Sequence, residues 1–155
     1  MDNFSITITQ YGKPLDESLY TIDVKNKIFA SRETNLVLDF TGIDGWTFRT
    51  SGDCIFNTGG RCTFNTEGSC TFNTGWSCMF HTRSYCTFNT YSDCTFKTDF
   101  HCIFNTGHCC TFSLYDINSH EFKTHDGNSI IIDREDLKHY LLTEEFVALQ
   151  KVKNG

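Results

Sequence analysis

Ten phenylalanines stand eight residues apart across the middle of the chain. They are Phe40, Phe48, Phe56, Phe64, Phe72, Phe80, Phe88, Phe96, Phe104 and Phe112. A cysteine precedes eight of them by two residues, and a threonine follows most of them by two, as in Cys62-Thr63-Phe64-Asn65-Thr66. A fixed period indicates one short structural unit stacked on copies of itself, so this repeat predicts a solenoid.

The repeat unit, an octad, divides into five strand residues and three turn residues, such as Gly59-Gly60-Arg61. Side chains alternate between the two faces of a strand, so Cys, Phe and the second Thr share one face and the first Thr and Asn share the other. We therefore expect an all-β β-solenoid whose inward cysteines and phenylalanines form ladders along the axis. The predicted core ladder comprises Cys54, Cys62, Cys70, Cys78, Phe56, Phe64, Phe72, Phe80, Phe88, Phe96 and Phe104.

The number of octads per turn depends on a longer period. The outward residue after cysteine is Thr except at Ile55, Met79 and Ile103, which are spaced three octads apart. This period of 24 favours a three-sided solenoid with three octads per turn, in which these three residues form a hydrophobic candidate partner face. Three such turns would make a rod of roughly 16 Å.

Two alternatives to this arrangement stay open. A rival period of 16 draws on four asparagines, set against different residues in the alternate octads. The asparagines are Asn57, Asn73, Asn89 and Asn105, and the alternate octads have His81, Lys97 and Ser113. In the second alternative, three chains wind around one another into a trimeric β-helix.

Segments on both sides of the repeat are expected to cap it, because open coil edges invite fibre growth. We assign residues 1–37 to an N-terminal β cap, 38–113 to the solenoid and 114–155 to a C-terminal cap. The N-terminal cap is predicted to contain a strand at 4–8 and a hairpin of strands 19–23 and 27–30.

In the C-terminal cap, strands 120–124 and 129–133 are predicted to form a hairpin on the Asp126-Gly127 turn, with a third strand at 138–142. Thr143 has the character of a helix N-cap, and Phe146, Leu149 and Val152 would form the apolar stripe of the helix. We expect this unit to close the far end of the solenoid or to dock on the candidate partner face.

Composition excludes several classes of function. The net charge of −6 comes from the two ends, because residues 46–113 carry four acidic and four basic residues. A surface that binds nucleic acid needs a basic stripe, and this sequence has none. No apolar run is long enough to span a membrane. No secretory signal is recognisable, so we expect reduced cysteines in the core, and a location in a host cytoplasm or a virion.

Two clusters resemble reactive sites. The first holds zinc-ligand types at His101, Cys102, His108, Cys109 and Cys110, but two of its cysteines already have inward ladder positions. The second holds titratable groups in the C-terminal cap, at Asp133, Glu135, Asp136 and His139. We interpret the first as core filler with surface histidines and the second as charged turns, and we expect no metal, no cofactor and no enzymatic activity.

The run Cys-Thr-Phe-Asn-Thr-Gly at 70–75, nearly repeated at 102–107, resembles uncharacterised phage and bacterial proteins with Cys-Thr-Phe-x-Thr octapeptide arrays. More distantly, the octad is similar to the triple-stranded helices of phage cell-puncturing spikes, which have Val and Gly where this chain has Cys and Phe. The resemblance implies a β-solenoid and a phage setting, and it implies no activity.

These observations predict a non-enzymatic structural or binding solenoid that presents flat faces to a protein partner. The first alternative is a soluble monomeric binder or inhibitor of a host factor, including a DNA mimic, and the second is a trimeric spike or fibre component. The outward Thr-x-Asn rows also resemble the arrays of ice-binding solenoids, but Arg49, His81 and Lys97 interrupt them.

Overall fold

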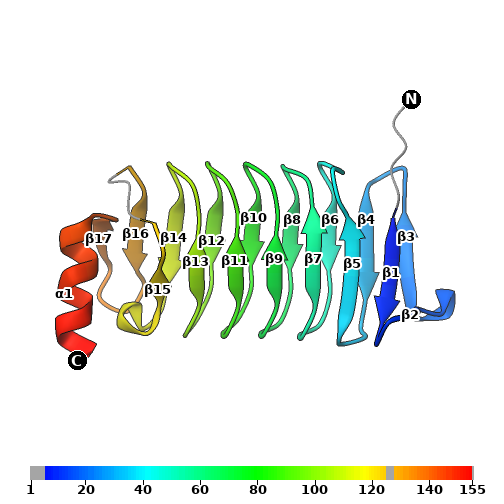
Figure 1. Ribbon diagram of the computed structural model, residues 1–155, viewed down its shortest axis with the longest axis horizontal. Coiled ribbons are helices and arrows are strands. Elements are labelled where there is room, and N and C mark those ends of the chain that lie inside the picture. Colours follow the sequence, from blue (N-terminus) through cyan, green and yellow to red (C-terminus); the bar gives the residue numbers. More distant parts are fainter. Residues whose placement is uncertain (1–5, 125–127, 155) are drawn as a thin grey trace.

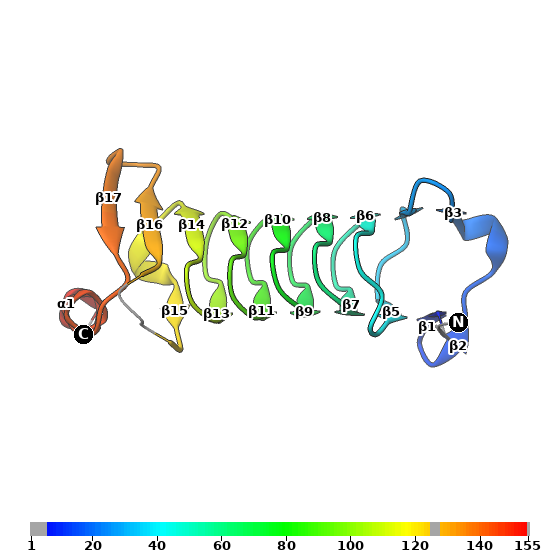
Figure 2. The same cartoon turned by 90° about the horizontal axis from the view of Figure 1, so that it is seen from above.

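The computed structural model describes residues 6–124 and 128–154, which form one elongated β-solenoid. Two sheets lie face to face, and the chain crosses from one to the other after nearly every strand of the repeat (Figures 1 and 2). The predicted all-β solenoid is therefore confirmed. Its stack has about six turns, which gives a rod of roughly 29 Å before the caps, longer than the three turns we expected.

Sheet A contains, in spatial order, β15 (Glu121–Phe122), β13 (Ile103–Asn105), β11 (Thr87–Asn89), β9 (Thr71–Asn73), β7 (Ile55–Thr58), β5 (Leu36–Phe40), β1 (Thr7–Gln10) and β2 (Lys13–Pro14). Sheet B contains β17 (Lys138–Leu141), β16 (Ile130–Asp133), β14 (Thr111–Leu114), β12 (Thr95–Lys97), β10 (Met79–His81), β8 (Thr63–Asn65), β6 (Thr47–Arg49), β4 (Ile28–Ser31) and β3 (Tyr20–Asp23). The repeat strands pair in parallel in both sheets.

The prediction of three sides was wrong, because each repeat strand pairs with the strands two octads away. Phe80 in β10 is in register with Phe64 in β8 and Phe96 in β12. Two octads therefore make one turn, and a single chain encloses its own core. The physical reason lies in the side chains, since phenylalanines from the two sheets meet directly across the interior and leave no room for a third wall.

The phenylalanines form one continuous aromatic core. Rings two octads apart stack nearly parallel, as Phe64 and Phe80 do at 4.9 Å between centroids. Rings one octad apart meet edge to face across the two sheets, as Phe80 and Phe88 do at 5.0 Å. All the phenylalanines of the predicted core ladder are buried, and each contributes about 1.5–3 kcal/mol by leaving water. The aromatic contacts add to this, since both geometries are favourable for π-systems.

Each corner of the repeat uses one residue in the left-handed region. The residue immediately before each ladder cysteine has φ between 54° and 64°, although none of these residues is glycine. They are Asp53, Arg61, Ser69, Ser77, Tyr85, Asp93, His101 and Cys109. The corners also bond to one another along the axis, for example from Arg61 N to Trp76 O at 2.7 Å. This regular hydrogen bonding holds a costly backbone conformation in place in every turn.

The N-terminal segment contains the predicted hairpin, formed by β3 and β4. β1 starts at Thr7, and residues 4–5 of the predicted strand lie outside the described residues. A 3-10 helix, η1 (Glu17–Leu19), precedes β3. β4 and β5 pair in parallel with β6 and β7, so the solenoid begins at β4, about half a turn before residue 38.

The predicted hairpin of the C-terminal cap was wrong. β15 joins sheet A beside β13, and β16 joins sheet B beside β14, so the two strands form one more turn of the solenoid. Phe122 and Ile131 take the inward positions that phenylalanine takes in the repeat. Residues 125–127, which include the predicted Asp126-Gly127 turn, lie outside the described residues. The period of eight residues did not predict this turn, because the connections before β15 and β16 are longer than three residues. The first of them contains the 3-10 helix η2 (Ile117–Ser119).

β17 pairs antiparallel with β16, which confirms the third predicted strand. The helix α1 (Glu144–Asn154) follows it, and the hydroxyl of Thr143 accepts a hydrogen bond from Phe146 N at 3.1 Å, as an N-cap does. α1 covers the C-terminal end of the rod (Figure 1). Phe146 is buried as expected, but Leu149 is exposed, and the side chain of Val152 lies outside the described part. No helix in the described residues is long and apolar enough to cross a membrane.

Candidate binding face

The predicted partner face does not exist as one surface. Ile55 and Ile103 lie on β7 and β13 of sheet A, whereas Met79 lies on β10 of sheet B. A separation of three octads places two side chains on opposite sides of a solenoid that has two octads per turn. The shared spacing of the three residues is therefore unrelated to any surface.

The outer face of sheet A carries two regular columns, which we call the Asn–Thr face. Register between adjacent strands aligns the first column as Ile55, Thr71, Thr87 and Ile103, and the second as Asn57, Asn73, Asn89 and Asn105. No charged residue interrupts these eight positions. The rival period of two octads, which rested on these asparagines, was the correct one.

The asparagines of this face bond to one another along the axis. Asn73 Nδ2 donates to Asn57 Oδ1 at 3.0 Å, and Asn89 Nδ2 donates to Asn73 Oδ1 at 3.0 Å. A ladder of amides needs identical residues one strand spacing apart, which the turn of two octads provides. These bonds fix the amide planes, so the column from Asn57 to Asn89 is a rigid row of donors and acceptors.

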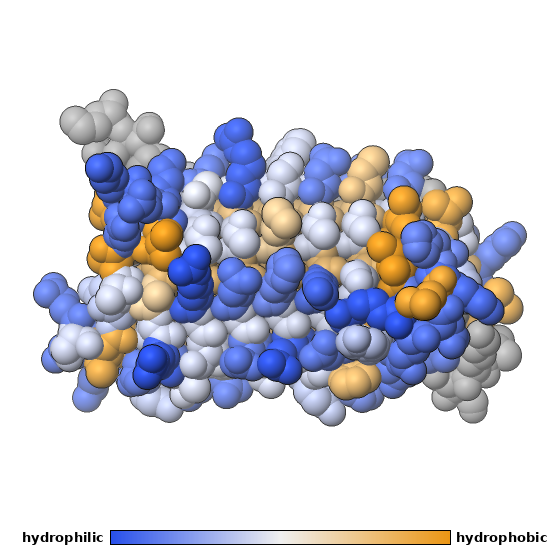
Figure 3. All heavy atoms as spheres, turned by 180° about the vertical axis from the view of Figure 1, so that it is seen from behind, coloured by the Kyte–Doolittle hydropathy of each residue, from blue (hydrophilic) through white to orange (hydrophobic). Residues whose placement is uncertain are grey.

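The outer face of sheet B differs in character, although it is built from the same octad. Its second column reads Arg49, Asn65, His81 and Lys97, so three of the four positions are basic or titratable. Figure 3 views the rod from this side and shows hydrophilic side chains in rows along its length. Arg49, His81 and Lys97, which interrupted the predicted Thr-x-Asn array, all belong to this sheet, so the asparagine column of sheet A is unbroken.

A groove runs along one edge of the Asn–Thr face. Its volume is about 1000 Å³, and it lies between the asparagine column and the row of corners that follows the strands of sheet A. Trp76 and Tyr91 line it from those corners, and both are largely exposed. Their rings meet edge to face at 5.9 Å between centroids. Sequence reasoning missed these two residues, because a single aromatic in a turn tripeptide has no periodic partner.

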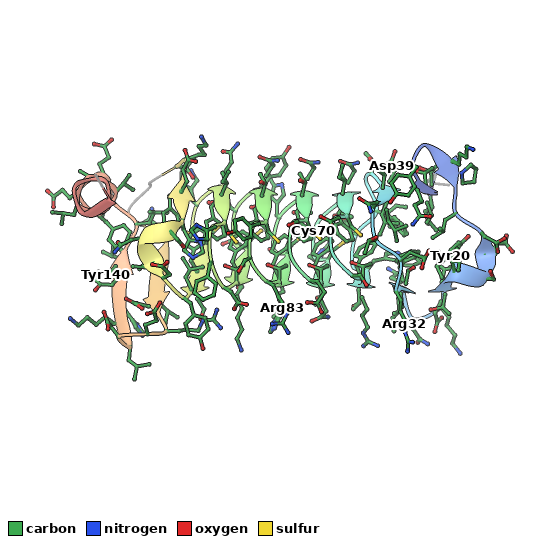
Figure 4. All side chains as sticks on the ribbon, turned by 90° about the horizontal axis from the view of Figure 1, so that it is seen from below. Tyr20, Arg32, Asp39, Cys70, Arg83 and Tyr140 are labelled. Atoms are coloured by element: carbon green, nitrogen blue, oxygen red, sulfur yellow. The ribbon has the colours of Figure 1, made fainter. Side chains whose placement is uncertain are left out.

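The cysteines of the repeat form two ladders inside the rod, each with one cysteine per turn. Figure 4 places Cys70 between the sheets, with sulfur atoms in a row along the axis, and places Arg83 on the outside. A hydrogen bond with the Cys78 thiol, together with burial, holds the pKa of Cys62 far above its usual value. A hydrogen bond with Cys102 and burial raise the pKa of Cys86 to about 11. The thiols of Cys62 and Cys86 therefore have little tendency to ionise.

The predicted zinc-ligand types do not converge in the structure. Cys102 and Cys110 point into the core, where their Sγ atoms approach corner carbonyls such as Phe100 O at 3.6 Å. His101 stacks on Tyr85 at 5.1 Å between centroids, on the outside of the rod. Among the described residues, no group of three or more His, Cys, Asp and Glu side chains is placed to hold a metal ion.

The predicted titratable cluster of the C-terminal cap surrounds the turn between β16 and β17. Asp133 is buried, and its Oδ1 accepts hydrogen bonds from Glu135 N at 2.9 Å and Asp136 N at 3.3 Å. His139 lies on the neighbouring strand β17, opposite Ile132. The carboxylate therefore orders the connection from β16 to β17, which agrees with our interpretation of these residues as a charged turn.

His120 is a buried group that the sequence did not reveal. Its Nδ1 accepts a hydrogen bond from Cys102 N at 3.1 Å, so Nε2 carries the proton and donates toward Asp99 O and Tyr115 O. Burial lowers the pKa of this imidazole. The neutral ring thus links the corner at 99–101 to the connection between β14 and β15.

Comparison with known proteins gives no relative for this chain, since no family model, curated protein or solved structure matches it.

Proposed function

We propose that the chain is a non-enzymatic structural or binding module that presents the Asn–Thr face to a protein partner. The observation that supports this is the contrast between the two sheets. One face is uncharged, flat and braced by its own amide ladder, while the other is charged and irregular. Charged residues are depleted at the centres of protein interfaces, so the uncharged face is the better contact surface.

Rigidity supports the same proposal. Every turn is held by parallel strand pairing, by stacked aromatic rings and by corner hydrogen bonds. A surface that is already ordered loses little conformational entropy when it binds. Among the described residues, the groups with shifted pKa values are the ladder cysteines, the buried imidazole of His120 and the turn carboxylates of Asp16 and Asp23. Each of them lies in an environment that serves the fold.

The setting we propose is a phage particle or an infected cell, following the resemblance of the octapeptide array. Two assemblies are compatible with a rod that completes its own core. A particle component associates with itself or with another particle protein, whereas an inhibitor of a host factor remains a monomer until it meets its target. Light scattering under reducing conditions detects self-association, with 17.8 kDa expected for the free chain and three times that mass for a trimer.

A matched pair of substitutions tests the face itself. Thr87→Lys places a charge at the centre of the Asn–Thr face, and Thr95→Lys places the same charge on the outer face of sheet B. We expect a partner captured by the tagged wild-type chain to be retained by Thr95→Lys and lost by Thr87→Lys. A partner that both variants retain, or that Thr95→Lys alone loses, would place the contact surface elsewhere.

A further inference from the structure

The groove beside the Asn–Thr face combines two recognition elements that the proposed protein contact does not require. The asparagine column forms one wall, and the exposed rings of Trp76 and Tyr91 rise from the other. Four asparagines one strand spacing apart extend over roughly 14 Å. The site is therefore long, open and polar on one side, and aromatic on the other.

The amide wall fits groups that both donate and accept hydrogen bonds. A primary amide has two N–H donors and an oxygen with two lone pairs. Within the ladder, Asn73 uses one N–H toward Asn57 and one lone pair toward Asn89. The other N–H and the other lone pair of this amide lie outside the ladder bonds. Hydroxyl groups match such an alternating row, because each hydroxyl is a donor and an acceptor.

The aromatic wall fits an apolar surface with polarised C–H groups. Trp76 is 60% exposed and Tyr91 is 59% exposed, and their mutual contact holds both rings beside the groove. The face of an aromatic ring carries negative charge density, which attracts the positive end of a C–H bond. Pyranose sugars combine such C–H faces with a rim of hydroxyl groups. We propose that this groove binds a neutral carbohydrate chain.

Charge distinguishes this ligand from the alternatives. The charged groups that line the groove are Asp44 and Arg61 at its N-terminal end, and they pair with each other at 3.7 Å. Phosphates, sulfates and carboxylates are bound by unpaired cations, most often arginine and lysine. A single-stranded nucleic acid would stack on the aromatic rings, but its backbone needs a positively charged groove. The lining therefore selects an uncharged ligand.

Binding of neutral hexasaccharides of glucose, mannose, galactose and xylose to the full chain tests the proposal. The measurements are an immobilised array followed by calorimetric titration of each sugar that binds. We expect at least one neutral sugar to bind, Trp76→Ala to weaken it at least tenfold and Trp76→Phe to retain most of the affinity. The matched control is Tyr85→Ala, which removes a ring of 64% exposure from the other row of corners and should leave the affinity unchanged.

Three results would overturn the proposal. They are binding to none of the neutral sugars, binding restricted to anionic oligosaccharides, and equal weakening by Trp76→Ala and Tyr85→Ala. Circular dichroism shows whether each variant is folded, and Tyr91→Ala serves as a second probe of the same wall if Trp76→Ala is not. Thr87 does not line the groove, so Thr87→Lys should leave sugar binding intact, and failure of the proposed protein contact remains distinguishable from failure of this site.

Discussion

Replacing Phe80 by alanine tests the aromatic core at its centre. The ring is 1% exposed and is sandwiched between Phe64 and Phe96, with 4.9 Å between centroids on each side. Phe72 and Phe88 meet it edge to face at 5.1 and 5.0 Å. Truncation of a buried phenylalanine costs about 3–5 kcal/mol, and the strand pairing above and below this site prevents the cavity from collapsing. We therefore expect a loss in the upper half of that range.

Equilibrium urea unfolding measures this loss, provided that the variant and the wild-type chain share one m value. The control is Phe100→Ala, which removes a ring of 42% exposure from a corner and should cost no more than about 1 kcal/mol. A loss below about 1 kcal/mol for Phe80→Ala would refute the assignment of the repeat phenylalanines to the core.

The same site distinguishes two octads per turn from three. Phe64 stacks on Phe80, whereas Phe56, which lies three octads away, would be its neighbour only in a three-sided solenoid. Substitution to leucine keeps apolar volume and removes the ring pair, so the Phe64–Phe80 double-mutant cycle should show about 0.5–1.5 kcal/mol of coupling. The Phe56–Phe80 cycle should show a smaller coupling, because these two rings are linked through their shared neighbours Phe64 and Phe72. The opposite pattern would contradict the observed register.

Three further predictions concern the thiols, the corners and the buried histidine. Iodoacetamide at neutral pH should modify exposed Cys109 and spare Cys86, because the pKa of Cys86 is raised to about 11, and peptide mass mapping reads the difference. Ser77→Gly should raise the free energy of unfolding by up to about 1 kcal/mol in thermal melts, since Ser77 has φ of 57° and the left-handed region is costly for residues with a Cβ. The lowered pKa of His120 means that the unfolded chain binds more protons below about pH 6.5, so stability should fall as pH drops from 7.5 to 5.5, and His120→Gln should reduce this fall in urea titrations.

The repeat unit could be read from the sequence because local physics determines it. Alternation places Cys, Phe and the second Thr on one face of any strand, and the structure buries residues of all three kinds, for example Cys70, Phe72 and Thr74. The corner tripeptides could also be predicted, because they interrupt the alternation of the strand residues. Neither feature depends on how many strands make one turn.

The number of sides could not be settled by the same means, because a strand followed by a corner is compatible with two or with three. The deciding contacts lie between turns, and only residues that require an identical neighbour report on them. Asn57, Asn73 and Asn89 are such residues, since their amides bond to one another. Ile55 and Met79 require no partner of their own kind, so their spacing carried no structural information.

The packing of the solenoid does not explain why sheet A carries a column of asparagines. Sheet B stacks its strands with the same register and the same buried rings, yet it places Arg49, His81 and Lys97 where sheet A places asparagine. An amide ladder is therefore not required for the turns to stack. Outward positions are free of the packing constraint that repeats Phe and Cys on both sheets, so the uniform column of sheet A has no cause in the core. A surface that recognises a repeating ligand provides such a cause, and both proposals accordingly lie on this side of the rod.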